Sequence, residues 1–193
     1  MRLRGASAPA DWLIVGLGNP GSRYAGTRHN VGFDVAEALI ERWDLGTPKK
    51  KYQGLLAEGR VPVGDRPRVA VLLPQTYMNE TGRSVGPARG AFKVELDRVL
   101  VLHDEIDLPF GDIRPRLGGG LAGHNGLKSL KAHLGSPDFA RIRIGVGRPD
   151  STDPEIVSSW VLGRFTEPAA DVGALIDRAR DTAEDLVLGR ATL

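Results

Sequence analysis

The chain has 193 residues, 41% of them hydrophobic and 26% charged, with a formal net charge of +2; this composition is typical of one soluble globular domain with a sizeable core. The absence of cysteine excludes disulfides, thiolate nucleophiles and cysteine-bound zinc. No apolar run approaches the roughly 20 residues that cross a bilayer, and the N-terminus lacks the apolar stretch of a signal peptide, so we expect a cytoplasmic protein.

The first half of the chain predicts alternating strands and helices. We expect a single domain over residues 1–193, with residues 1–10 as a flexible N-terminal extension. Residues 11–17, DWLIVGL, have the pattern of a buried strand, and a loop rich in Gly, Pro and Asn leads to an amphipathic helix from about Val31 to Trp43. YQGLLAEGRV and RVAVLLP are typical of neighbouring strands around the turn-like VPVGDRP, and a helix follows over roughly 80–92.

The second half continues the alternation. RVLVLHDEID is typical of an apolar strand that runs into acids, DIRPRL of a short extended piece, residues 126–134 of a helix, and ARIRIGVG of an alternating strand. Pro168 introduces a closing helix over 168–188. Because helix-length crossovers separate the strands, the predicted fold class is α/β: a single domain with a mixed, mostly parallel central sheet flanked by helices. Functional residues of such folds gather at the carboxyl ends of the strands.

Two short motifs suggest functions that their surroundings disfavour. GLGNPG (16–21) matches a dinucleotide-binding fingerprint, but that fingerprint needs a helix to begin at its last glycines, and here the helix waits until after Asn30. GRSVG (82–86) matches the nucleophile elbow of serine hydrolases, but the preceding strand ends at Pro74, so we expect Ser84 inside a helix. A serine hydrolase with Ser84 as nucleophile stays open as a minority alternative.

Positive charge is concentrated in one segment. Residues 113–148 hold seven Lys/Arg against one acid, a net charge of +6. A basic segment is most often a solvated surface, but RLGGGLAGHNG lies inside this one, and its glycines let backbone approach a ligand closely. The segment therefore predicts a site for an anionic group.

A histidine, an acid and three asparagines lie in or beside predicted loops that follow strands: His29, Asp104, Asn19, Asn79 and Asn125. Ester cleavage by water needs a base, a partner that orients it, and donors for the oxyanion. Neutral histidine can be the base, a carboxylate can fix its tautomer, and amides donate without changing charge. Each residue alone is more simply a cap or a turn residue. Their projection to one edge of the sheet favours a catalytic site.

Four ordered segments carry a resemblance that covers nearly the whole chain: VGLGNPGSRYAGTRHNVGF, PQTYMNETGRSVG, VLHDEIDLPFGDIRPRLGGGLAGHNGLKS and FARIRIGVGRP. In these segments the sequence resembles bacterial peptidyl-tRNA hydrolases. The resemblance implies a monomeric esterase with one catalytic domain and with neither metal nor cofactor. It also implies peptidyl-tRNA as the partner, bound by its acceptor stem and 3′ CCA end. The expected reaction cleaves the ester between the peptide carbonyl and the 3′-terminal ribose, which recycles tRNA.

The resemblance further implies roles for the loop residues. His29 in TRHN matches the catalytic base, and Asp104 in HDEID matches its partner. Asn19 and Asn79 match asparagines that bind the peptide near the scissile carbonyl. Asn125 in GHNG matches one that helps to place the attacking water or the tRNA end.

Two aromatic and two basic residues complete the implied site. Tyr24 and Tyr77 match residues that line it, while Arg116 and Arg143 match a basic pair that holds the 5′ phosphate of tRNA. Guanidinium groups suit phosphate and read no sequence, so we expect many tRNAs to be accepted.

One difference from the family's sequence pattern and one alternative class of function remain. Leu121 and Ala122 stand where relatives often have polar or glycine residues, which puts the flexibility and wetness of this loop in doubt. A chloroplast intron-splicing relative uses the same architecture to engage a protein partner, so a binding module stays open as a second function class.

Overall fold

The computed structural model describes residues 7–193. The first six residues of the predicted flexible extension, 1–10, lie outside the described residues. Its remaining part contacts the domain: the Ser7 and Tyr52 hydroxyls lie 2.7 Å apart, and the Ala10 N–H donates to the Phe92 carbonyl at 3.1 Å. Within the described residues, no helix is both long and apolar enough to span a membrane.

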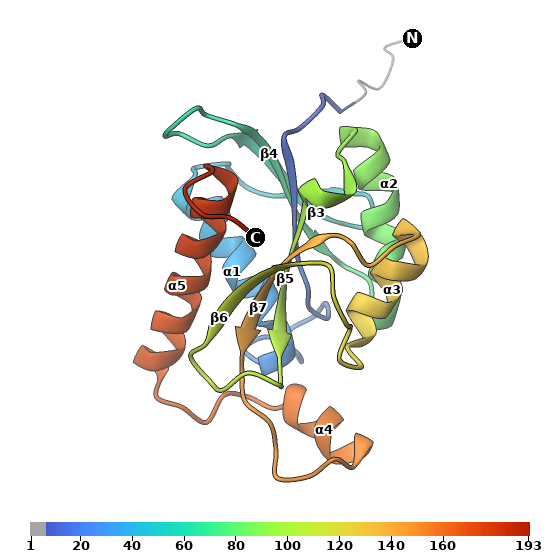
Figure 1. Cartoon of the computed structure of the whole chain (residues 1–193), viewed down its shortest axis with the longest axis vertical. Coiled ribbons are helices and arrows are strands. Elements are labelled where there is room, and N and C mark those ends of the chain that lie inside the picture. Colours follow the sequence, from blue (N-terminus) through green and yellow to red (C-terminus); the bar gives the residue numbers. More distant parts are fainter. Residues whose placement is uncertain (1–6) are drawn as a thin grey trace.

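A single sheet forms the centre of the described chain (Figure 1). Its seven strands follow the order β2 (Lys49–Lys51), β3 (Gly54–Arg60), β4 (Arg68–Pro74), β1 (Trp12–Gly16), β5 (Val99–Glu105), β7 (Ala140–Gly145) and β6 (Ile113–Leu117). The four central strands β4, β1, β5 and β7 are parallel to one another, whereas β3 and β6 pair antiparallel with their neighbours. The predicted mixed, mostly parallel α/β sheet is confirmed.

Helices cover both faces of the sheet (Figure 1). One face packs against α1 (Val31–Arg42) and α5 (Ala169–Val187), and the other against α2 (Gly82–Phe92) and α3 (Asn125–Leu134). The central strands are buried on both faces, so they carry continuous apolar runs such as the WLIVG of β1. A short helix, α4 (Pro154–Val161), lies apart from these layers, beyond the carboxyl ends of β5 and β7 (Figure 1).

Two glycines let α1 approach the sheet closely. A Cβ on Gly16 would lie 2.5 Å from the Gly32 carbonyl oxygen, and one on Gly32 would lie 2.3 Å from the Leu102 carbonyl oxygen. Because α1 begins only at Val31, the first glycines of GLGNPG serve strand and helix packing and do not bring a helix N-terminus to a ligand. This geometry does not fit a dinucleotide-binding fingerprint, as the sequence predicted.

The second motif, GRSVG, lies inside α2, as the sequence argument expected. The side chain of Ser84 is fully buried, and its hydroxyl has no hydrogen-bond partner in the described chain. Since a nucleophile must reach its substrate, the minority interpretation of Ser84 as a serine-hydrolase nucleophile is wrong. Ser84 instead faces the strand backbone at Gly54, where an added Cβ would lie 3.1 Å from its hydroxyl oxygen.

Candidate active site

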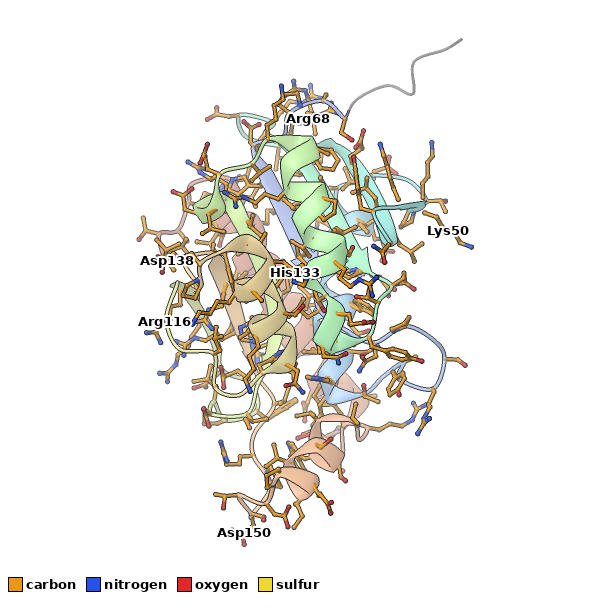
Figure 2. All side chains as sticks on the ribbon, turned by 90° about the vertical axis from the view of Figure 1, so that its right-hand side faces the viewer. Lys50, Arg68, Arg116, His133, Asp138 and Asp150 are labelled. Carbon is orange, nitrogen blue, oxygen red and sulfur yellow. The ribbon has the colours of Figure 1, made fainter. Side chains whose placement is uncertain are left out.

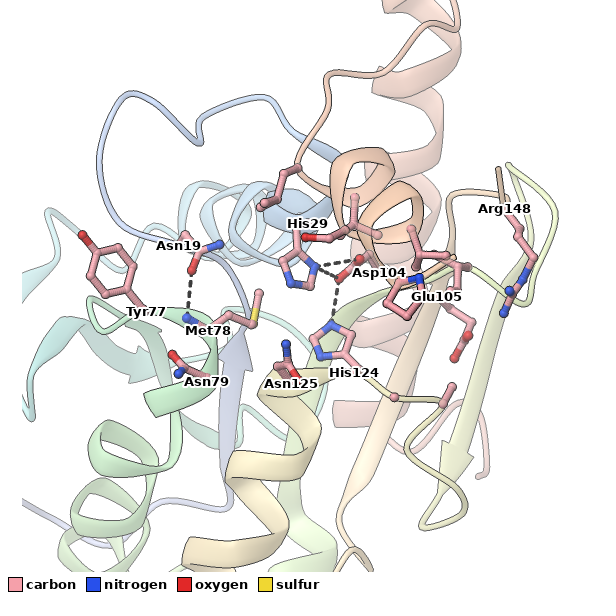
Figure 3. A pocket seen from close by; sticks show the side chains of 18 of the residues that line it. Asn19, His29, Tyr77, Met78, Asn79, Asp104, Glu105, His124, Asn125 and Arg148 are labelled. Carbon is pink, nitrogen blue, oxygen red and sulfur yellow. Dashed lines mark hydrogen bonds and ion pairs between the residues drawn. The ribbon is translucent and has the colours of Figure 1, made fainter. Parts of the chain in front are cut away.

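A cavity of about 580 Å³ lies beyond the carboxyl ends of β1, β4 and β5, roofed by α4 (Figure 3). This is the edge of the sheet at which the sequence pattern predicted a site. Polar and apolar groups both line it: Asn19, His29, Tyr77, Met78, Asn79, Asp104, Glu105, Ile106, Ala122, Gly123, His124, Asn125, Arg148, Thr152, Pro154, Val157, Ser158, Val161 and Leu162.

The predicted pair of His29 and Asp104 is in direct contact. His29 lies in a short 3-10 helix, η1 (Arg28–Asn30), that precedes α1, and Asp104 lies near the end of β5. His29 Nδ1 lies 2.9 and 3.0 Å from the two carboxylate oxygens of Asp104 (Figure 3). Because an ionised carboxylate only accepts, Nδ1 must carry the proton and Nε2 must be the basic nitrogen. Nε2 has no partner among the described residues.

A second histidine shares the same carboxylate. His124 caps the N-terminus of α3, and its Nδ1 accepts the backbone N–H groups of Gly126 at 3.1 Å and Leu127 at 3.4 Å. Its Nε2 must therefore carry the proton, which it donates to Asp104 Oδ1 at 2.9 Å. The cap thus fixes both the tautomer of His124 and one oxygen of Asp104.

Contact between His29 and Asp104 shifts the pKa of each group in the direction that favours its charged form. Burial disfavours the imidazolium of His29, but the adjacent Asp104 carboxylate outweighs that effect and raises the pKa of His29 above 6.5. Burial alone would raise the pKa of Asp104, but its two histidine partners outweigh burial and hold that pKa well below the usual range. Asp104 is therefore ionised at neutral pH, and His29 gains a proton readily.

A third histidine, His103, lies behind the cluster and stays neutral. Burial, followed by the proximity of His124, lowers the pKa of His103 to about 3. Its Nδ1 donates to the Asp104 carbonyl at 2.8 Å, and its ring centroid lies 5.3 Å from that of His124.

Asn19 presents an amide donor to the cavity. Its Oδ1 accepts the backbone N–H of Met78 at 2.8 Å, so its Nδ2 is left without a partner among the described residues (Figure 3). Asn30 holds the Asn19 backbone on both sides, since its Oδ1 accepts the Asn19 N–H and its Nδ2 donates to the Asn19 carbonyl, each at 2.9 Å. Asn30, which follows His29 in the chain, thereby fixes the position of Asn19 relative to His29.

The other predicted loop residues divide into two groups. Tyr77, Asn79 and Asn125 are exposed and line the cavity together with His29 and Asp104. Tyr24 and the two predicted phosphate ligands do not line the cavity. Tyr24 lies in the loop after β1, whereas Arg116 and Arg143 lie on the antiparallel pair β6 and β7 at the edge of the sheet.

Arg28, the residue before His29, holds helix α4 over the cavity. Arg28 stacks its guanidinium on the Trp160 ring of α4, 3.6 Å from the centroid, and donates to the Trp160 carbonyl at 2.9 Å. Its backbone N–H also donates to the Gly163 carbonyl at 3.0 Å. Val157, Ser158 and Val161 are thereby placed over the cavity. The sequence prediction omitted α4.

Three side chains of the site have the chemistry of metal ligands. One nitrogen each of His29 and His124 and an oxygen of Asp104 lie within 4.8 Å of one another. Both imidazole nitrogens that face Asp104 carry protons in this arrangement, so a cation would have to displace them. A site without metal or cofactor stays a prediction.

Comparison with known proteins assigns the chain to a family. The family model for peptidyl-tRNA hydrolase matches residues 13–192. The chain belongs to the peptidyl-tRNA hydrolase family. Peptidyl-tRNA hydrolases of Halalkalibacterium halodurans and Geobacillus kaustophilus are 47% and 48% identical to it, over 89% and 91% of this chain and 91% and 92% of their own length. A crystal structure of peptidyl-tRNA hydrolase from Acinetobacter baumannii matches with a TM-score of 0.83 at 39% identity, covering 96% of this chain and 93% of that chain.

Among the residues absent from the sequence prediction, Arg28, Asn30 and His124 position this peptidyl-tRNA hydrolase site through their side chains. Arg28 and Asn30 flank the predicted base, and their contacts reach α4 and the loop after β1. A usable signal existed for His124, because the dipeptide His-Asn occurs twice, at 29–30 and at 124–125, each time at the start of a helix.

Proposed function

We propose that this member of the family hydrolyses peptidyl-tRNA by general-base catalysis, with His29 activating the attacking water and Asp104 orienting His29. The family assignment makes the protein a hydrolase of the ester bond in peptidyl-tRNA. The observation that carries the mechanism is the anchoring of His29 Nδ1 on a buried carboxylate, which leaves Nε2 as the base in a cavity lined by asparagines.

In this mechanism, water attacks the ester carbonyl while His29 Nε2 accepts one of its protons. The new carbon–oxygen bond gives a tetrahedral oxyanion and an imidazolium, and Asp104 stabilises the imidazolium through the Nδ1 bond. The bond to the ribose oxygen then breaks, and the imidazolium returns its proton to that oxygen. General-base assistance of this kind is worth about 10²–10⁴ in rate, which suits an ester.

The asparagines supply the polar contacts of the substrate. Asn19 Nδ2 is a donor held in place by Met78 and Asn30, so it suits the peptide carbonyl or the oxyanion. Asn79 binds the peptide beside it, and Asn125 places the water or the 3′ end of the tRNA. Tyr77, 59% exposed at the cavity, offers a stacking surface. Tyr24 lies farther out, so we propose that it contacts only the extended peptide.

The tRNA phosphate is proposed to lie on the edge of the sheet, against Arg116 and Arg143. Neither residue forms an ion pair with an acid among the described residues, so both guanidinium groups are available for an anion. We further propose that the enzyme acts as a monomer in the cytoplasm, where its substrate arises, and requires no metal.

The test is release of an N-blocked aminoacyl group from tRNA by the wild type, His29→Ala and the matched control Ser84→Ala. Hydrolysis by the wild type and the control, with loss in His29→Ala, is the expected result. Equal activity of all three proteins would refute the role of His29. A wild type that binds tRNA but releases nothing would favour the binding-module alternative.

A further inference from the structure

Four arginines occupy one face of the antiparallel pair β6 and β7. Arg116 lies directly opposite Arg141, and Arg114 lies directly opposite Arg143. Side chains alternate along a strand, so all four point away from the face that carries Ile142 and Ile144 and toward the side of the sheet that α3 covers. Like charges directly opposite each other destabilise a sheet, so this arrangement calls for a compensating function.

One member of the group differs from the others. Arg141 is 1% exposed, and its guanidinium donates to the Gly120 carbonyl at 2.9 Å and to the Gly118 carbonyl. Both glycines belong to the turn that follows β6. Arg141 therefore braces this turn from the sheet side with two charge-assisted hydrogen bonds, of which the one to Gly118 is buried and the one to Gly120 is part-buried.

The neighbouring arginine contacts the same turn. Gly119 has φ +97°, and a Cβ at this position would lie 2.4 Å from the Arg116 guanidinium. Arg116 itself is exposed, so it can touch an anion on one side and the turn on the other (Figure 2). The turn is thus held between a proposed phosphate ligand and a buried brace.

The braced turn leads directly into the active site. Leu121 packs on the hydrophobic cluster beneath α3, and its carbonyl accepts the His124 N–H at 2.9 Å. This apolar contact anchors the loop to the core at Leu121. His124 then holds Asp104, and Asn125 lines the cavity. A displacement of the turn therefore passes to both residues.

We infer that Arg141 is a positioning residue that couples phosphate binding at Arg116 and Arg143 to the placement of His124 and Asn125. This inference rests on the proposed function. Burial and the charges of Arg116 and Arg143 oppose the charge on Arg141 and lower its pKa, while Glu105 favours that charge. A bound phosphate offsets the two opposing charges, so the brace is firmer in the complex with tRNA.

The kinetic test compares Arg141→Met with the matched control Arg114→Met. Both remove one positive charge, but Arg114 is exposed, pairs with Asp112 at 3.2 Å and contacts no carbonyl of the turn. On a short N-blocked aminoacyl-CCA fragment, which lacks the 5′ phosphate, Arg141→Met is expected to lower kcat by about tenfold or more, and Arg114→Met to leave it unchanged. Arg141→Lys is expected to recover only part of kcat, because one ammonium cannot span two carbonyls.

A wild-type kcat for Arg141→Met would overturn the inference. So would an effect confined to KM for full-length tRNA, since that pattern belongs to a direct phosphate contact. Circular dichroism checks the fold of each variant. If the methionine variant does not fold, Arg141→Lys and the exchange experiment below decide the question.

The second measurement is amide hydrogen exchange at His124 in the wild type, with a deacylated acceptor minihelix that carries or lacks the 5′ phosphate. We expect the phosphorylated RNA to slow exchange at His124 by about threefold or more relative to the other RNA. Equal exchange with both RNAs bound would refute the coupling and leave the proposed function intact. Failure of both RNAs to bind would instead refute the proposed tRNA site.

Discussion

Replacing Asp104 by asparagine tests the link between the carboxylate and the base. The side chain of Asp104 is 2% exposed and accepts one hydrogen bond from each of His29 and His124 at 2.9 Å. A charge-assisted bond of this kind is worth about 1.5–3 kcal/mol, so losing its support for the imidazolium slows the reaction about 10- to 150-fold. Asparagine also permits the opposite tautomer of His29, which removes the base from Nε2. We therefore expect kcat to fall by about 10²–10⁴.

The pH profile separates this effect from general damage. Neutral His29 is the active form, so kcat/KM is lost as pH falls through the pKa of His29, which Asp104 raises above 6.5 in the wild type. In Asp104→Asn only burial remains, and burial lowers that pKa, so the inflection moves to lower pH. Steady-state rates on an N-blocked aminoacyl-tRNA between about pH 5 and 9 measure both quantities. A fall of less than about tenfold, or an inflection that does not move, would show that Asp104 does not support His29 as the base.

Three further predictions concern tRNA, acid stability and metal. Arg116→Ala combined with Arg143→Ala should raise KM for full-length peptidyl-tRNA and flatten its salt dependence, with little effect on a short 3′ fragment; equal damage to both substrates would contradict the phosphate assignment. The pKa of His103 is about 3 in the folded protein and 6.5 in the unfolded chain, so at pH values between these two His103 is protonated only in the unfolded chain. The stabilisation that neutral His103 provides is therefore complete above pH 6.5, and it declines by about 1.36 kcal/mol per pH unit as pH falls toward 3. The free energy of unfolding measured in urea should therefore fall less steeply with decreasing pH in His103→Asn than in the wild type. Enzyme treated with a chelator should retain its rate on the short fragment, and recovery only on adding a divalent cation would contradict a mechanism without metal.

The contact between His29 and Asp104 followed from the topology. β1 and β5 are adjacent and parallel, so the segments after their carboxyl ends meet at one edge of the sheet. Apolar runs identified both strands because both of their faces are buried. The order of those runs and the helix-length crossovers between them predicted that both residues lie at one edge of the sheet, and the pairing of β1 with β5, which makes them neighbours, is a finding of the structure.

Other features depend on contacts that leave no local pattern. Helix α4 has only eight residues, none of them buried, and helical periodicity is judged over windows of about 11–18 residues, so the segment escaped prediction although Asp153 and Pro154 form its N-terminal signal. Strand β2 is three exposed lysines that pair through their backbone alone. His124 joins the site because its ring caps α3 and also reaches Asp104, which no spacing along the chain predicts.

The most direct test of His29 as the base is its own titration, followed by NMR on the folded enzyme and compared with the pH profile of kcat/KM. We expect a single pKa above 6.5 for His29 that coincides with the kinetic inflection. If His29 keeps one protonation state across the range in which the rate changes, another group accepts the proton from water, and the mechanism proposed for this hydrolase is wrong.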